Sequence, residues 1–211
     1  KEVFLKIVTQ RQTDFLFYIS SSYINRFREH ESFKKYLEVE KIDFEGKSYF
    51  QCHRVILDYY KSLIPENYEY YLAPFSIKKN SNIFGLIFGS SHPLALEKFL
   101  AAAWKIDKLR GEANYDIDKD RINPATPSLF PEFNTPKKLQ VFEEELTNQI
   151  LQRNLLSNYD VYLFGLTNGF LPKHVNTIIR KLIKQHKINS FKTCSSNVHK
   201  LRRYPEKIVV R

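Results

Sequence analysis

Residues 170–188 read FLPKHVNTIIRKLIKQHKI, and the organisation of the C-terminal part of the chain follows from this stretch. A proline stands near its start, and no acidic residue occurs along it. Proline suits the first turn of a helix, because its ring fixes φ and an N–H at that position would have no helical partner. The spacing therefore predicts an amphipathic helix, with an apolar face of Val175, Ile178, Ile179, Leu182 and Ile183.

The opposite face of this predicted helix carries residues that suit a nucleic acid. Lysine and arginine contact phosphates, arginine can read guanine, and asparagine can read adenine. The candidate nucleic-acid-binding residues on this face are Lys173, Asn176, Thr177, Arg180, Lys181 and Lys184.

The net charge of +10 is concentrated around this helix. Residues 1–135 carry 19 basic against 18 acidic side chains, and residues 136–169 carry 3 against 4. Residues 170–211 carry 11 basic side chains and only Glu206 as an acid. A segregated excess creates a local positive potential, which attracts polyanions.

Two further helices are predicted directly before the basic one. PKKLQVFEEELTNQILQRN predicts a helix that begins near Thr135, and NYDVYLFGLTNG predicts a second, capped by Asn158 and ended at Gly169. The segment SFKTCSSNVHKLRRYPEKIVV, after the basic helix, is expected to form a strand pair. This order is that of a winged helix-turn-helix over residues 136–211, and its wing would add Lys192, Lys200, Arg202 and Arg203 to the candidate site.

Residues 1–110 alternate helical and strand-like patterns, which indicates an α/β layer. EVFLKIVTQ and CHRVILDYYKSLI predict helices, SYINRFREHESFKKYLE one or two solvent-facing helices, TDFLFYIS a buried strand and FEGKSYFQ a turn. YEYYLAPFSI and IFGLIFGSS predict a hairpin, and SSHPLALEKFLAAAWKID a helix capped by Ser90 or Ser91. Residues 111–135 break all periodicity, with four of the nine prolines between Pro124 and Pro136, and are the predicted linker.

No residue pattern identifies a catalytic or metal site. Asp116, Asp118 and Asp120 have the alternate spacing of a calcium loop, but Arg121 and Pro127 replace the glycine and glutamate that such a loop needs. The FGSSHP turn is better explained by helix capping than by phosphate binding. Whether the chain is an enzyme stays open, and no metal is expected.

The bulk composition is that of a globular protein, at 43% hydrophobic and 15% aromatic residues. There is no signal-peptide pattern and no long apolar run, so a cytoplasmic protein is expected. Because the sequence has no methionine and begins with lysine, we expect a longer reading frame.

Three stretches together carry a resemblance to a known family: FLFYISSSYINRF, FGLIFGSSHPLALEKFLAAAWKID and LFGLTNGFLPKHVNTIIRKLIKQHKI. They resemble the three-Cys-motif partner proteins, which have a class I methyltransferase-like domain followed by a GMT-like winged helix. The resemblance implies that residues 1–110 are the C-terminal part of such a methyltransferase-like domain. TDFLFYIS would be its fifth strand and the hairpin its last two strands.

The same resemblance sets the functional expectation. It implies a DNA-binding accessory protein of a mobile element or phage-related system, acting with a three-cysteine radical-SAM-like partner. The first alternative is a methyltransferase whose S-adenosylmethionine-binding half lies outside residues 1–211, since these residues are expected to supply no cofactor site. The second is a protein–protein interaction module that binds no nucleic acid. The oligomeric state is not predicted.

Overall fold

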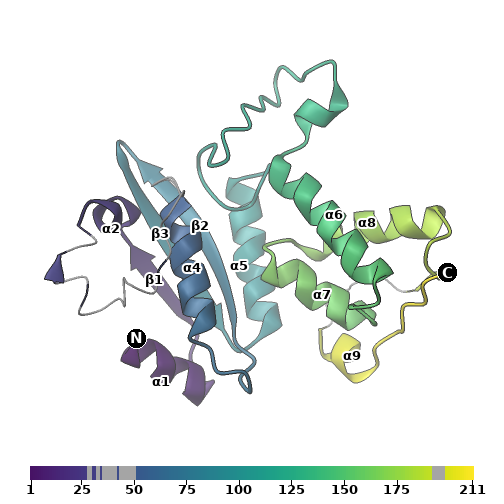
Figure 1. Ribbon diagram of the computed structural model, residues 1–211, viewed down its shortest axis with the longest axis horizontal. Coiled ribbons are helices and arrows are strands. Elements are labelled where there is room, and N and C mark those ends of the chain that lie inside the picture. Colours follow the sequence, from purple (N-terminus) through teal and green to yellow (C-terminus); the bar gives the residue numbers. More distant parts are fainter. Residues whose placement is uncertain (28–29, 32–33, 35–41, 43–50, 192–197) are drawn as a thin grey trace. The chain divides into compact units, whose positions relative to one another are not determined.

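The computed structural model describes residues 1–27, 30–31, 34, 42, 51–191 and 198–211. The chain divides into two compact units, Lys1–Ile117 and Asp118–Arg211 (Figure 1). Residues 44–50 of the predicted turn FEGKSYFQ and most of the predicted helices after Phe27 lie outside the described residues. Within the described part, no helix is long and apolar enough to cross a membrane.

Unit 1 is a mixed α/β unit around a small antiparallel sheet. The sheet order is β1-β3-β2, so the last strand of the hairpin pairs with both other strands. The elements are α1 (Glu2–Gln10), β1 (Phe15–Ile19), α2 (Ser21–Phe27), α4 (Cys52–Ser62), β2 (Tyr71–Lys79), β3 (Asn82–Ser90) and α5 (Pro93–Ile106). The predicted hairpin is confirmed, and so is a strand at Phe15–Ile19, but this strand is not buried as expected. Phe15 is buried, whereas Leu16 and Tyr18 are 56% and 61% exposed, because alternate side chains point to a more exposed face. The methyltransferase-like identity of the layer stays a prediction.

The two faces of the sheet are covered by different helices (Figure 1). Phe15, Leu72 and Ile87 share one face and pack in a core cluster with residues of α1 and α4. On the other face, the rings of Phe88 and Phe99 of α5 stack with centroids 4.9 Å apart. Alternate residues of a strand point to opposite faces of the sheet. Because helices cover both faces here, both carry apolar side chains.

The hairpin turn has the geometry that its sequence favours. Asn80 and Ser81 connect the strands, and Lys79 pairs with Asn82. Asn80 has φ of 56°, a left-handed conformation that asparagine tolerates better than most residues. The register places Leu72 opposite Gly89, where an added Cβ would lie 2.3 Å from the ring of Phe15. Gly89 is therefore needed for the packing of β1 against β3.

The start of α5 differs from the prediction. The N-cap residue is His92, and not Ser90 or Ser91 as the sequence predicts. The helix begins at Pro93, whose fixed φ suits the first turn, and Ser90 Oγ instead accepts a hydrogen bond from the backbone N–H of His92 at 2.9 Å. The predicted helix itself is confirmed, and its Leu96 and Trp104 are buried.

Unit 2 is a helical unit with η3 (Pro131–Asn134), α6 (Lys137–Leu151), α7 (Asn158–Thr167), α8 (Pro172–Lys184) and α9 (Val198–Arg203). The three helices predicted between Thr135 and Ile188 are confirmed. The N-cap of α7 is Ser157 and not Asn158, because Ser157 and Asp160 form a reciprocal capping box. The core of the unit contains Phe142, Leu146, Ile150, Val161, Leu166, Phe170, Val175, Ile179 and Leu182.

The segment after α8 is only partly the predicted strand pair. Ile188 and Val210 form an antiparallel bridge, and Ser157 and Lys207 form another. The C-terminal residues therefore pair with the segment before α7 and with the segment after α8, as at the base of a wing. Between these bridges, Val198–Arg203 form a short helix with Leu201 buried, so the strand prediction is wrong there.

Candidate nucleic-acid interface

Helix α8 is positioned by its apolar face. Val175, Ile178, Ile179 and Leu182 are buried, between 0% and 6% exposed, at the spacing of one helical face. An added Cβ on Gly165 of α7 would lie 2.4 Å from Val175 Cγ2, so glycine allows α7 and α8 to approach closely. The opposite side of α8 therefore faces away from the core of its unit.

Residues 168–171 form the turn between α7 and α8. Gly169 has φ of 81°, which is favourable for glycine and strained for other residues. The buried Phe170 follows and stacks on Phe142 of α6, with ring centroids 3.8 Å apart. A short turn that contains glycine is typical of a helix-turn-helix.

The N-terminus of α8 is capped by a neutral histidine. The backbone N–H of Leu171 donates a hydrogen bond to His174 Nδ1 at 3.1 Å. Burial, together with the nearby charges of Lys173 and Lys138, lowers the pKa of His174 to about 4. The imidazole is thus uncharged at neutral pH, and Nδ1 remains an acceptor.

Four of the predicted site residues form one continuous stripe. Lys173, Thr177, Arg180 and Lys184 are all exposed, and their spacing of four, three and four places them on the side opposite the apolar face. We call these four residues the basic stripe. Thr177 Oγ1 donates to the backbone carbonyl of Lys173 at 3.0 Å, which leaves its methyl group for contacts outside the helix.

The other two predicted residues of α8 lie beside the stripe. Asn176 is half-buried. Lys181 Nζ lies 2.6 Å from Glu143 Oε1 of α6, in an ion pair between two partly exposed side chains. The structure thus separates Lys181, which is paired with an acid, from the basic stripe.

Only two of the four predicted wing residues have side chains that the structure describes. Arg202 and Arg203 are exposed, but on helix α9 and not on a strand. Arg203 lies over the ring of Tyr204, 5.5 Å from its centroid. Lys192 lies outside the described residues, and the side chain of Lys200 is not described. The structure therefore brings the α8 residues together, and of the four expected wing residues it describes the side chains of Arg202 and Arg203, on a helix.

The comparison with known families agrees with this geometry. Residues 114–193 match the GMT-like wHTH domain family. The C-terminal region is therefore a winged helix-turn-helix domain. Helices α7 and α8, joined by the turn at residues 168–171, are the candidates for its helix-turn-helix. No curated protein and no solved structure matches the chain. A winged helix-turn-helix domain suggests DNA binding, and α8 is its recognition-helix candidate.

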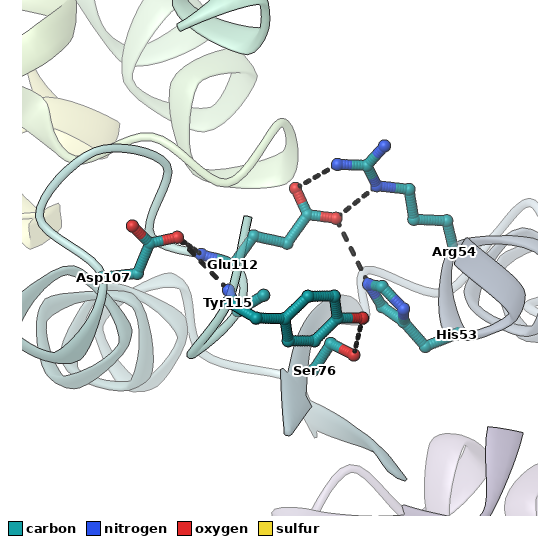
Figure 2. A network of polar contacts seen from close by, with 7 residues as sticks. His53, Arg54, Ser76, Asp107, Glu112 and Tyr115 are labelled. Carbon is teal, nitrogen blue, oxygen red and sulfur yellow. Dashed lines mark hydrogen bonds and ion pairs between the residues drawn. The ribbon is translucent and has the colours of Figure 1, made fainter. Parts of the chain in front are cut away.

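A second polar arrangement lies in unit 1 (Figure 2). Glu112 accepts hydrogen bonds from Arg54 Nε at 2.5 Å and Arg54 Nη2 at 2.9 Å, and its Oε1 lies 3.3 Å from Nε2 of the fully buried His53. Tyr115 OH lies 2.9 Å from Ser76 Oγ, and burial raises the pKa of Tyr115 to about 12. We call the Glu112 contacts with His53 and Arg54 the Glu112 clasp.

The Glu112 clasp fixes the first part of the predicted linker to the sheet. The backbone N–H of Ser76 donates to the carbonyl of Glu112 at 2.7 Å, and Ser76 bridges Ala113 in parallel. Asp107 accepts four further backbone N–H groups of this segment. Residues 107–117 therefore belong to unit 1 and cover the edge of β2.

The Glu112 clasp was not predicted from the sequence, because His53 and Glu112 are 59 positions apart. One local signal was available. His53 shares the buried face of α4 with Ile56 and Tyr60, and a polar side chain on such a face requires a partner.

Asp116, the first residue of the acidic loop, pairs with the buried Arg110 at 2.7 Å.

Proposed function

We propose that the C-terminal domain binds duplex DNA by placing α8 in the major groove. The observation that carries the proposal is the basic stripe, which stands on the solvent side of the second helix of a helix-turn-helix. The major groove is about 12 Å wide and admits one α-helix. In this arrangement Arg180, near the middle of the stripe, would contact base edges, and Lys173 and Lys184 would contact phosphates.

The wider function proposed for the chain is that of an accessory DNA-binding protein in a mobile element or phage-related system. It would act with a three-cysteine radical-SAM-like partner protein. This proposal is supported by the resemblance of three stretches between Phe15 and Ile188 to the three-Cys-motif partner proteins and by the GMT-like match over residues 114–193.

The DNA-binding proposal is tested by titrating labelled duplex DNA with the chain at about 50 and 200 mM salt. The variant R180A/K184A removes two charges of the basic stripe, and K98A/K105A removes two exposed charges of α5 as a matched control. We expect wild type and the control to bind more tightly at low salt. We expect R180A/K184A to bind at least tenfold more weakly at the same salt, since each lost contact costs roughly 1 kcal/mol or more. No binding by wild type at low salt would refute the proposal.

An interaction module is the second candidate function, and a separate feature of unit 2 favours it. Leu129, Phe130 and Phe133 are 96%, 60% and 65% exposed. Asn134 holds their loop, because its side chain accepts from the N–H of Ser128 at 2.7 Å and donates to the Ser128 carbonyl at 2.9 Å. Exposed apolar side chains on an ordered loop suit a protein partner.

Copurification with the three-cysteine partner protein after nuclease treatment tests this second function. A retained complex that is lost in L129S/F130S/F133S would support an interaction module. A complex that disappears on nuclease treatment would instead indicate that DNA bridges the two proteins.

A further inference from the structure

The groove between α6 and α8 has a different charge character from the basic stripe. It has a volume of about 560 Å³, and both acidic and basic side chains line it, among them Glu143, Glu144, Lys181 and Lys187. The basic stripe, in contrast, consists of three basic side chains and a threonine, with no acid among its four residues. The two sides of α8 therefore present unlike surfaces to an approaching polyanion.

The ion pair in this groove determines what Lys181 can do. Its Nζ lies 2.6 Å from Glu143 Oε1, and the two side chains are 52% and 43% exposed. A phosphate that contacted Lys181 would have to displace the carboxylate of Glu143 or lie beside it. Glu144 lines the same groove, so a phosphate there would meet a second negative charge within about one Debye length of 8–10 Å.

We propose that Glu143 and Glu144 form an acidic guard, which keeps the DNA backbone off the α6 side of α8 and withholds Lys181 from phosphates. This inference rests on the proposed function and adds the orientation of the DNA on the domain. The backbone is confined to the basic stripe, and Lys181 becomes a positioning residue that ties α8 to α6. Like-charge contacts of this kind restrict the ways in which a surface can be engaged.

The variant E143Q tests the guard, with E145Q as the matched control. Both remove one negative charge from neighbouring positions of α6, but Glu145 is exposed and does not line the groove. Exposed ion pairs add little to stability, so E143Q is expected to fold, which circular dichroism checks. Duplex binding is measured at about 50 and 200 mM salt for wild type, E143Q, E145Q, K181A, R180A and E143Q/K181A.

We expect E143Q to bind tighter than wild type at the lower salt concentration. Its affinity should also fall by a further factor of about three between the two salt concentrations, because one more phosphate contact forms. K181A alone should change binding by less than about twofold, whereas K181A on the E143Q background should remove the gain.

Two results would overturn the guard: equal gains in E143Q and E145Q, or a loss of binding in K181A as large as that in R180A. The first would mean a general charge effect, and the second would mean that Lys181 already contacts DNA. Absence of binding by wild type would overturn the proposed function itself, so the two failures are distinguishable.

Discussion

Gly169 stands in the turn between α7 and α8 with a positive φ. Its φ of 81° is open to glycine, and an added Cβ would approach Lys138 Nζ at 3.2 Å. We predict that Gly169→Ala lowers the free energy of unfolding by about 1–3 kcal/mol, because a non-glycine residue is strained there. Chemical denaturation measures the loss.

Gly169→Asn is the control for this prediction. Asparagine adopts positive φ more readily than alanine, so it should lose less stability although its side chain is larger. If asparagine and alanine cost the same, crowding and not backbone strain would explain the effect.

His174 links the stability of the turn to pH. Its folded pKa of about 4 lies below the ordinary 6.5, so the unfolded chain binds a proton first as the pH falls. The contribution of His174 is fully present above about pH 6.5 and is lost as the pH falls toward 4. We predict that the difference in unfolding free energy between wild type and His174→Gln is largest near pH 7 and shrinks toward pH 4. A pH-independent difference would contradict this account.

At the scale of elements, helices were predictable where apolar residues recur along the chain. The periodicity of residues 170–188 was sufficient for α8 and its buried face, and the same holds for α6 and α7. The caps were less predictable, since Ser157 competes with Asn158 and only the reciprocal bond with Asp160 decides between them. Helix α9 is only six residues long, and Leu201 is the buried apolar residue among the side chains described there, so its pattern could not distinguish a helix from a strand.

The candidate site was predictable in part for the same reason. A helical period specifies which residues of α8 face away from the core, so the basic stripe follows from sequence. The helical period does not specify which residue of another helix contacts Lys181, because its partner Glu143 is 38 residues away in the sequence. Contacts between distant positions, such as this pair and the Glu112 clasp, depend on tertiary packing.

The Glu112 clasp is expected to stabilise unit 1. Glu112 is 4% exposed and shares its carboxylate between Arg54 and His53. We predict that Glu112→Gln lowers the free energy of unfolding of unit 1 by about 3 kcal/mol, because it removes the buried negative charge that Arg54 and the buried His53 contact. Thermal unfolding measures the loss, and Glu66→Gln, an exposed charge-matched change, should have almost no effect. Equal losses would show that the clasp contributes nothing specific.

At the scale of the whole molecule, the two units differ in charge. The whole excess of +10 comes from residues 170–211, whereas residues 1–135 are close to neutral. A local positive surface on a winged helix-turn-helix domain is the arrangement that DNA binding requires. The methyltransferase-like identity of unit 1 stays a prediction, and its antiparallel hairpin is the feature that agrees with it.

The contact between α8 and DNA is tested most directly by a titration of the ¹⁵N-labelled chain with duplex DNA, followed by NMR. We expect the largest amide shift changes at Lys173, Thr177, Arg180 and Lys184, with smaller changes along the α6 side of the groove near Glu143. Shift changes confined to other elements, or none at low salt, would contradict the central claim that the basic stripe of α8 binds DNA.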